Sequence, residues 1–178
     1  MYIWLGIDVD SQLNEIKQEA KRVEREIGFI HSNFTLPLHI SLKISFKIDD
    51  NLVDKLISDI SNFFNTIKPF DIQVEGIEYD QTITWIRMKN NQSLNLIHDE
   101  LNKFLLEKYD IPLHEYDLDY KFHTTLFMDD DSCKVKKAYD LIKTFEVPLT
   151  LRANKFLIGK SKEGKLGTYK VFKEIVRH

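Results

Sequence analysis

Two stretches of this sequence, His39-Ile40-Ser41-Leu42 and His123-Thr124-Thr125-Leu126, share one pattern: a histidine, a spacer, a hydroxyl residue and a leucine. Each lies in a run of apolar and β-branched residues, which is typical of a β-strand. Side chains alternate between the two faces of a strand, so His39 and Ser41 share a face, and so do His123 and Thr125. Two such strands side by side would bring two imidazoles and two hydroxyl groups together.

The sequence around these motifs repeats one order of elements. The two histidines are 84 positions apart (123 minus 39), which is close to half of the 178-residue chain. Apolar spacing predicts helices at about residues 11–27, 50–67, 93–109 and 132–145. Strands are expected at residues 2–9, 38–46, 70–79, 82–88, 121–128, 147–158 and 166–176, with a turn at 160–164.

This repetition predicts the fold class. We expect one α+β domain over residues 1–178, with no Pro/Gly/Ser-rich linker inside it. The domain should be bilobed and duplicated, with two pseudo-symmetric halves of about residues 1–80 and 81–178. Antiparallel sheets should surround a central groove, related by a pseudo-two-fold axis, with the helices packed outside.

Composition and charge exclude several classes of protein. A net charge of −3 argues against a protein that coats long nucleic acid, although a local cluster of Lys and Arg can bind a small anion or an oligonucleotide end. The single Cys133 excludes an internal disulfide framework and a thiol-rich zinc site. The sequence shows no basic leader and no long apolar run, so we expect a cytoplasmic protein without a membrane segment.

Two H-x-[S/T]-hydrophobic motifs, one in each half of a chain of this size, resemble the 2H phosphoesterase superfamily, which includes bacterial 2′-5′ RNA ligase-like proteins and RNA 2′,3′-cyclic phosphodiesterases. The resemblance covers the whole chain in element order, and in residue identity mainly the two tetrapeptides. In the opening strand, Tyr2-Ile3-Trp4 replaces an arginine often found in the RNA ligase-like branch.

The resemblance implies a function and a site. His39 and His123 would be the catalytic residues of a metal-independent phosphodiesterase, and Ser41 and Thr125 would bind the substrate phosphate. The substrate would be a 2′,3′-cyclic phosphate or a 2′-5′-linked nucleotide or RNA end, and reversible 2′-5′ ligation is a related activity. The alternative is a non-catalytic module that binds a nucleotide or RNA end in the same groove. No cofactor is implied, and a monomer is expected.

Histidine chemistry fits these roles. With an ordinary pKa near 6.5, an imidazole can accept or donate a proton near neutral pH. One histidine would deprotonate water and the other would protonate the departing ribose oxygen. The motifs alone do not say which histidine is the acid.

Five further residues are candidates for substrate contacts. Strict alternation places Lys43 on the face of His39, where it would neutralise phosphate charge or lie exposed at the strand end. Phe127 would share the face of His123, as a base-stacking ring or as part of the core. Tyr2 and Trp4 are candidate groove-wall residues, and Arg87 could reach phosphate from its strand.

A metal site is not favoured by the spacing of the acids and histidines. The sequence has no H-x-x-x-H pair and no clustered acids of metal-ligand spacing. His98, beside Asp99 and Glu100, is expected on the solvated face of a helix.

Overall fold

The computed structural model describes every residue except 31, 33 and 166. Its strands are β1 (Tyr2–Asp8), β2 (His39–Lys47), β3 (Phe70–Asp80), β4 (Ile83–Met88), β5 (His123–Met128), β6 (Thr150–Ala153), β7 (Lys155–Ser161) and β8 (Lys170–Val176). Its α-helices are α1 (Asn14–Ile27), α2 (Val53–Thr66), α3 (Gln92–Tyr109) and α4 (Ser132–Ile142). Short 3₁₀ turns lie at η1 (Ser11–Leu13), η2 (Asp50–Leu52) and η3 (Glu115–Asp117).

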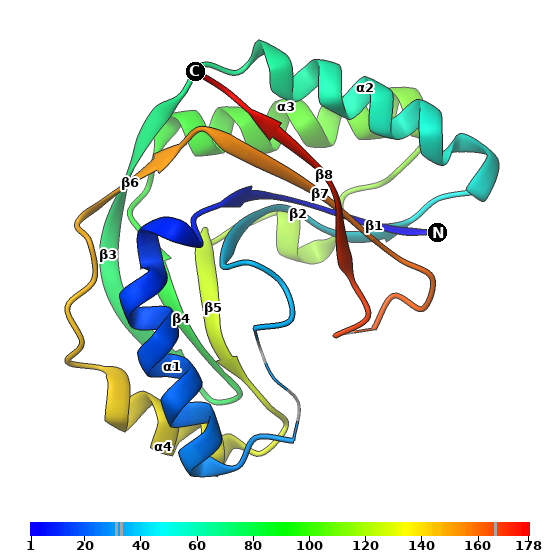
Figure 1. Ribbon diagram of the computed structural model, residues 1–178. Helices are drawn as coiled ribbons and strands as arrows, with labels where there is room; N and C mark the ends of the chain where they lie inside the picture. Colours follow the sequence, from blue (N-terminus) through cyan, green and yellow to red (C-terminus); the bar gives the residue numbers. More distant parts are fainter. Residues whose placement is uncertain (31, 33, 166) are drawn as a thin grey trace.

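The strands form two four-stranded antiparallel sheets, in the orders β2-β1-β7-β8 and β5-β4-β3-β6. Both motif strands, β2 and β5, are therefore edge strands, and they contact each other where the two sheets meet. The expected α+β class with antiparallel sheets is confirmed (Figure 1).

Two of the four described α-helices, α1 and α3, pack against the sheet that does not contain the strand before them. Helix α1 follows β1, but it packs against α4 and β5 of the other sheet, whereas α3 follows β4 and packs against β2 (Figure 1). Each sheet also takes strands from both halves of the chain, because β7 and β8 complete the sheet of β1 and β2, and β3 belongs to the sheet of β4, β5 and β6. The two lobes therefore do not coincide with residues 1–80 and 81–178, although the repeated order of elements is present.

Local sequence explains where the helices begin and end. Asn91 caps α3 by accepting a hydrogen bond from the backbone N–H of Leu94, and Asp131 caps α4 in the same way through Cys133 and Lys134. Helix α1 ends at Gly28, whose φ of 80° is the left-handed conformation that glycine adopts without strain.

One expected strand is in fact two. Residues 147–158 were expected to form a single strand, but β6 pairs with β3 in one sheet and β7 pairs with β1 in the other. The chain changes sheets at Asn154, between the two strands. The last strand begins at Lys170, and its expected start, residue 166, lies outside the described residues.

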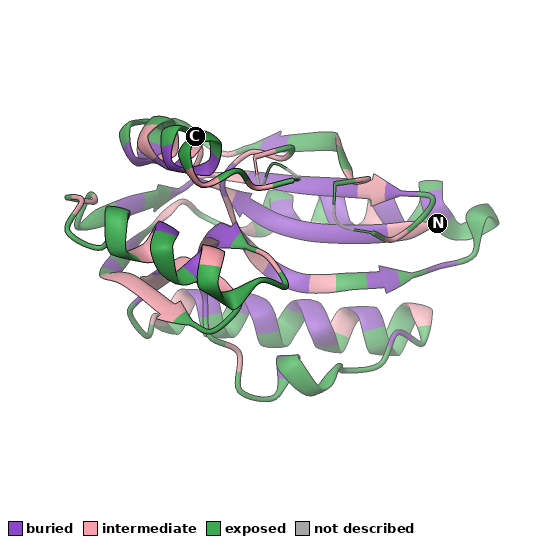
Figure 2. Ribbon diagram, turned by 90° about the horizontal axis from the view of Figure 1, so that it is seen from below, coloured by how far each residue is buried: buried purple, intermediate pink, exposed green. Residues whose placement is uncertain are grey.

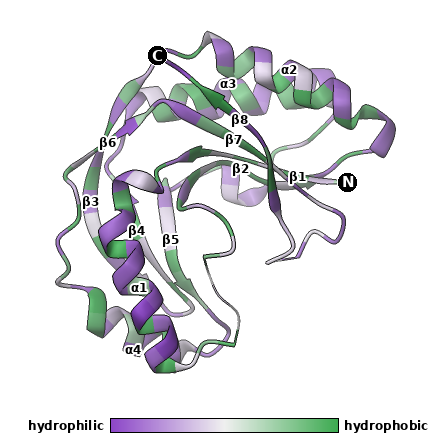
Figure 3. Ribbon diagram, viewed as in Figure 1, coloured by the Kyte–Doolittle hydropathy of each residue, from purple (hydrophilic) through white to green (hydrophobic). Residues whose placement is uncertain are grey.

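The core lies between the sheets and their helices. The strands contain long buried stretches, and exposed residues gather on the outer faces of the helices (Figure 2). Hydrophilic and hydrophobic residues alternate along α1, which is the pattern of a helix with one buried face (Figure 3). Within the described part of the chain, no helix is long and apolar enough to cross a membrane.

Candidate active site

A pocket of about 280 Å³ lies where the two motif strands meet. Its walls combine His39 and Ser41 of β2 with Thr125 of β5. His123 is two residues from Thr125 on the same strand, and both are half-buried, whereas Thr124 between them is buried. The remaining walls are largely apolar: Trp4, Thr35, Leu36, Pro37, Leu38, Ile44, Ser45, Met128, Gly167 and Tyr169.

The two histidines are held by matching backbone bonds. The Nδ1 atom of His39 lies 2.7 Å from the carbonyl oxygen of Pro37, and the Nδ1 atom of His123 lies 2.7 Å from that of Lys121. A carbonyl oxygen can only accept, so each Nδ1 carries the proton and donates it. Each neutral imidazole therefore keeps an unprotonated Nε2, the nitrogen that can accept a proton from a substrate or water.

Both histidines titrate below their ordinary range. Burial is the main cause that lowers the pKa of His39 to about 4, and the charge of His123 contributes in the same direction. The backbone bond to Pro37 acts in the opposite direction. Burial also lowers the pKa of His123, again opposed by its backbone bond. The charge of His123 is thus one of the influences that act on the His39 imidazole.

The hydroxyl of Ser41 has its own partners. The indole Nε1 of Trp4 donates to Ser41 Oγ over 3.2 Å. The Trp4 ring also meets the His39 ring edge-on, with centroids 4.1 Å apart. Trp4 is thus in the pocket wall, as expected, but it contacts both residues of the first motif.

Lys43 does not lie where strict alternation predicts. Gly6 pairs with Ser41 but Leu5 pairs with Lys43, so a β-bulge follows the motif and turns Lys43 inward. Its side chain is only 1% exposed and forms an ion pair with Asp117. The expectation of an exposed strand-end lysine is wrong, and the ammonium is already held by a carboxylate rather than offered to phosphate.

Phe127 repeats this displacement in the second motif. Trp85 pairs with Thr125 but Thr84 pairs with Phe127, which places a bulge at the same point after the motif leucine. Phe127 is fully buried and stacks on Phe29. It belongs to the core and has no exposed face for a nucleobase, so its role as a stacking platform is wrong.

Tyr2 and Arg87 lie beyond the pocket walls. Tyr2 is at the far end of β1, where its ring packs against Gly164 of the turn before β8. Arg87 pairs in register with His123, but its guanidinium forms ion pairs with Glu75 and Glu78. Neither residue touches the pocket, so a contact with substrate would need Arg87 to exchange its carboxylate partners.

Sequence reasoning missed a buried polar cluster behind the motifs. His98 is 4% exposed, not solvated as expected, and its ring stacks on Tyr120. Its Nε2 lies 3.6 Å from Asp117, the carboxylate that also holds Lys43. Burial raises the pKa of Tyr120, and a hydrogen bond with Ser41 opposes that shift. Tyr120 therefore stays a neutral phenol beside the motif hydroxyl.

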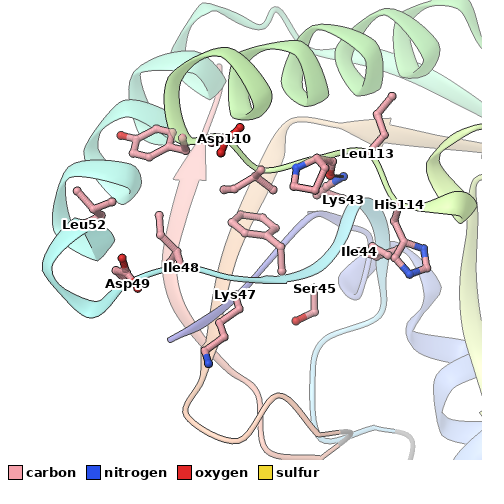
Figure 4. Close-up of a pocket in the computed structure, with 14 residues that line it drawn as sticks. Lys43, Ile44, Ser45, Lys47, Ile48, Asp49, Leu52, Asp110, Leu113 and His114 are labelled. Carbon is pink, nitrogen blue, oxygen red and sulfur yellow. Dashed lines mark hydrogen bonds between the residues drawn. The ribbon is translucent and has the colours of Figure 1, made fainter.

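A larger hollow of about 550 Å³ lies on the other side of β2, between Lys43–Leu52 and the loop after α3. Figure 4 shows its residues, with the ring of His114 on the loop beside Ile44 of the strand. It shares only Ile44 and Ser45 with the motif pocket and contains none of the motif histidines or hydroxyls. The chemistry-bearing side chains therefore converge on the smaller pocket.

The described residues contain no group of three His, Cys, Asp or Glu side chains placed to hold a metal ion.

The architecture has close counterparts among solved structures. Thermus thermophilus TT0787 superposes with a TM-score of 0.66 at 16% identity, covering 99% of this chain and 97% of that one. E. coli LigT gives 0.61 at 17% identity, covering 98% and 96%, and a protein described as a phosphoesterase gives 0.57 at 15% identity, covering 99% and 98%. A search of curated proteins found no match.

The decisive comparison is with a family model. Residues 15–165 match the model of the 2′-5′ RNA ligase superfamily, which spans both motifs. The chain belongs to this superfamily. The resemblance to the 2H phosphoesterases that the two motifs indicated is thereby confirmed. Members of the superfamily are phosphoesterase- or ligase-type enzymes. Structures of E. coli LigT have been solved with 3′-AMP, ATP, NADP⁺ and phosphate.

Proposed function

We propose that this chain is a phosphodiesterase that acts without a metal on 2′,3′-cyclic phosphate or 2′-5′-linked nucleotide and RNA ends. The observation that carries the proposal is the matched pair of backbone bonds, which leaves Nε2 unprotonated on both histidines, on the two adjacent strands whose residues His39, Ser41 and Thr125 line one pocket. Binding alone does not need two proton-transfer groups. The nucleotide complexes of E. coli LigT support a small nucleotide or a short RNA end as the partner.

Hydrolysis of a cyclic phosphate would then proceed by in-line displacement. Nε2 of one histidine removes a proton from water, and the water oxygen bonds to phosphorus. The bond from phosphorus to a ribose oxygen breaks, and the second histidine gives that oxygen its proton. Ser41 and Thr125 donate to the non-bridging oxygens, whose negative charge grows in the transition state.

The surroundings of the two histidines suggest how they divide this work. Burial and the neighbouring His123 lower the pKa of His39 to about 4, which keeps His39 deprotonated as the base. In this division of roles His123 is the acid, although burial lowers its pKa too, against the raising effect of its backbone bond. A bound phosphodiester anion favours the imidazolium, so substrate would supply the charge that keeps His123 protonated as the acid.

The pH dependence of kcat/KM follows from these shifts. Burial disfavours the charged imidazole, so both pKa values lie below 6.5 in the free protein. We expect a bell-shaped profile that rises near pH 4 as His39 loses its proton and falls again before about pH 6.5. The kcat profile should lie at higher pH, because bound phosphate raises both pKa values. Initial rates across pH would measure this, and a kcat/KM maximum at alkaline pH would contradict it.

Removing one phosphate donor should cost less than removing a histidine. Ser41→Ala or Thr125→Ala should lower kcat roughly 10- to 10³-fold, since each removes one hydrogen bond that strengthens in the transition state. Ser58→Ala, on the exposed face of α2, is the matched control and should keep wild-type rates. Steady-state kinetics would show the effect in kcat rather than KM. Wild-type kcat in both pocket variants would remove the hydroxyls from the mechanism.

Turnover should survive an excess of chelator, because histidines rather than metal-bound water supply the proton transfers. The assay is hydrolysis of a nucleoside 2′,3′-cyclic phosphate before and after treatment with EDTA. Loss of activity that zinc or manganese restores would replace this mechanism with a metal-dependent one.

A turnover screen tests the function itself. The purified chain would be incubated with the four nucleoside 2′,3′-cyclic phosphates and with 2′-5′-linked dinucleotides, and products would be followed by ³¹P NMR. Formation of a 2′- or 3′-monophosphate supports the enzyme. If one of these nucleotides binds saturably but none of them is converted to product, the alternative of a nucleotide-binding module is supported instead.

A further inference from the structure

The Trp4 ring lies against two glycines, Gly6 of β1 and Gly159 of β7. A Cβ atom at Gly6 would lie 2.7 Å from Cζ2 of the Trp4 ring, and one at Gly159 would lie 2.5 Å from its Cε3. Real Cβ atoms essentially never make contacts this short, so the indole packs directly on the glycine backbones of β1 and β7. The ring is 6% exposed and is held in one place on the sheet.

From this place Trp4 contacts both functional residues of the first motif. Its Nε1 donates to Ser41 Oγ over 3.2 Å, and its ring meets that of His39 edge-on at 4.1 Å between centroids. An indole N–H can only donate, so Ser41 Oγ accepts this bond. The proton of the Ser41 hydroxyl must then point elsewhere, which leaves it for an acceptor in the pocket or for the oxygen of Tyr120.

The second motif also has a tryptophan nearby, but at a different register position: Trp85 pairs with Thr125, whereas Gly6 rather than Trp4 pairs with Ser41. Trp85 lies on β4 beside β5, and its ring centroid is 5.3 Å from that of His123. Its Nε1, however, donates to Glu78 over 3.3 Å rather than to the motif hydroxyl. The two motifs match in sequence, yet only the first has its hydroxyl tied to a buried indole.

We propose that Trp4 is a positioning residue, whose indole N–H orients the Ser41 hydroxyl toward the substrate phosphate while its ring fixes His39. This inference rests on the proposed function, because it assigns Ser41 a phosphate oxygen as its acceptor. Gly6 and Gly159 contribute because they have no Cβ, which lets the indole lie flat on the strands. The first motif then works as a rigid unit built from three strands, β7, β1 and β2.

A double-mutant cycle tests the positioning role. Trp4→Phe keeps an aromatic ring against His39 but removes the N–H, and kcat should fall roughly 2- to 12-fold, the range of one ordinary hydrogen bond, with KM little changed. In the Ser41→Ala background the same change should cost less than about 2-fold, because no hydroxyl is left to orient. Equal losses in both backgrounds would overturn the proposal and leave Trp4 a packing residue.

Trp85→Phe is the matched control, since it removes an indole N–H that is bonded to Glu78 instead. Its effect, whatever its size, should be the same with and without Ser41. Coupling of Trp85 to Ser41 as strong as that of Trp4 would also overturn the proposal. Thermal unfolding of each variant would confirm that folded proteins are being compared.

A measurement on the otherwise intact chain covers the case in which Trp4→Phe fails to fold. The two tryptophans give two indole N–H signals in the NMR spectrum. Ser41→Ala should move the Trp4 signal and speed its exchange with solvent, and inorganic phosphate should shift it more than the Trp85 signal. No response of the Trp4 signal to either change would reject the orienting bond. If the wild-type chain turns over no substrate, the proposed function fails, and these spectra still decide whether Trp4 holds Ser41.

Discussion

Replacing either His39 or His123 by alanine should lower kcat by about 10²- to 10⁴-fold, the usual contribution of one general acid or base. The pair acts as a unit, because in-line displacement needs a proton removed and a proton delivered in the same reaction. The double variant should therefore be little slower than the slower single variant. Single-turnover rates with a nucleoside 2′,3′-cyclic phosphate would measure all three.

The control for this series is His178→Ala, which removes an exposed imidazole far from the motifs in sequence and should leave kcat unchanged. Wild-type turnover in His39→Ala together with an inactive His123→Ala would replace the symmetric mechanism with a single-base one. His39 would then be a structural histidine, held by Pro37 and packed against Trp4.

Asp117→Ala should destabilise the protein by about 3–5 kcal/mol, the cost of leaving a buried charge without its partner. The ammonium of Lys43 would remain in the interior. Of its two present hydrogen-bond partners among the described residues, the carbonyl oxygen of Pro112 would be left. The backbone N–H of His114 would also lose its acceptor. Against a total stability of about 5–15 kcal/mol, this loss would be plain in urea unfolding.

Asp119→Ala is the control, since that exposed carboxylate lies two residues away and should change stability by less than about 0.5 kcal/mol. Lys43→Met combined with Asp117→Leu should recover much of the loss, because it removes both charges from the interior. A loss below about 1 kcal/mol in Asp117→Ala would mean that water reaches Lys43, and that its burial does not depend on the ion pair.

Much of the fold was predictable because its signals are local. All four α-helices were expected within a few residues of where they lie, since apolar spacing and capping residues act over one or two turns. Both motif strands were expected too. The packing of α1 and α3 against the opposite sheet was not, because the apolar face of α1 looks the same whichever sheet covers it. The break at Asn154 was equally hidden, because the strand with which each segment pairs lies far away in the sequence.

The candidate site, too, was predictable where its signals are local and not where they depend on the tertiary fold. Alternation correctly paired each histidine with its hydroxyl residue, but it failed one step later, at Lys43 and Phe127. A β-bulge depends on the partner strand and leaves no mark in the sequence of the bulged one. The burial of His98 was missed for a related reason. Its partner Asp117 lies on a loop that only the tertiary fold brings to α3.

The place of β1 in its sheet has a consequence for how the molecule is made. Strand β1 lies between β2 and β7, and Trp4 pairs with Gly159. About 150 residues separate the end of β1 from the start of β7. At about 5–20 residues per second, a ribosome needs roughly 8–30 s to add them. During that time one edge of β1, with its apolar Ile3, Leu5 and Ile7, has no partner. In a nascent chain, β1 can therefore complete its sheet, and Trp4 can pack on Gly159, only after β7 has been made.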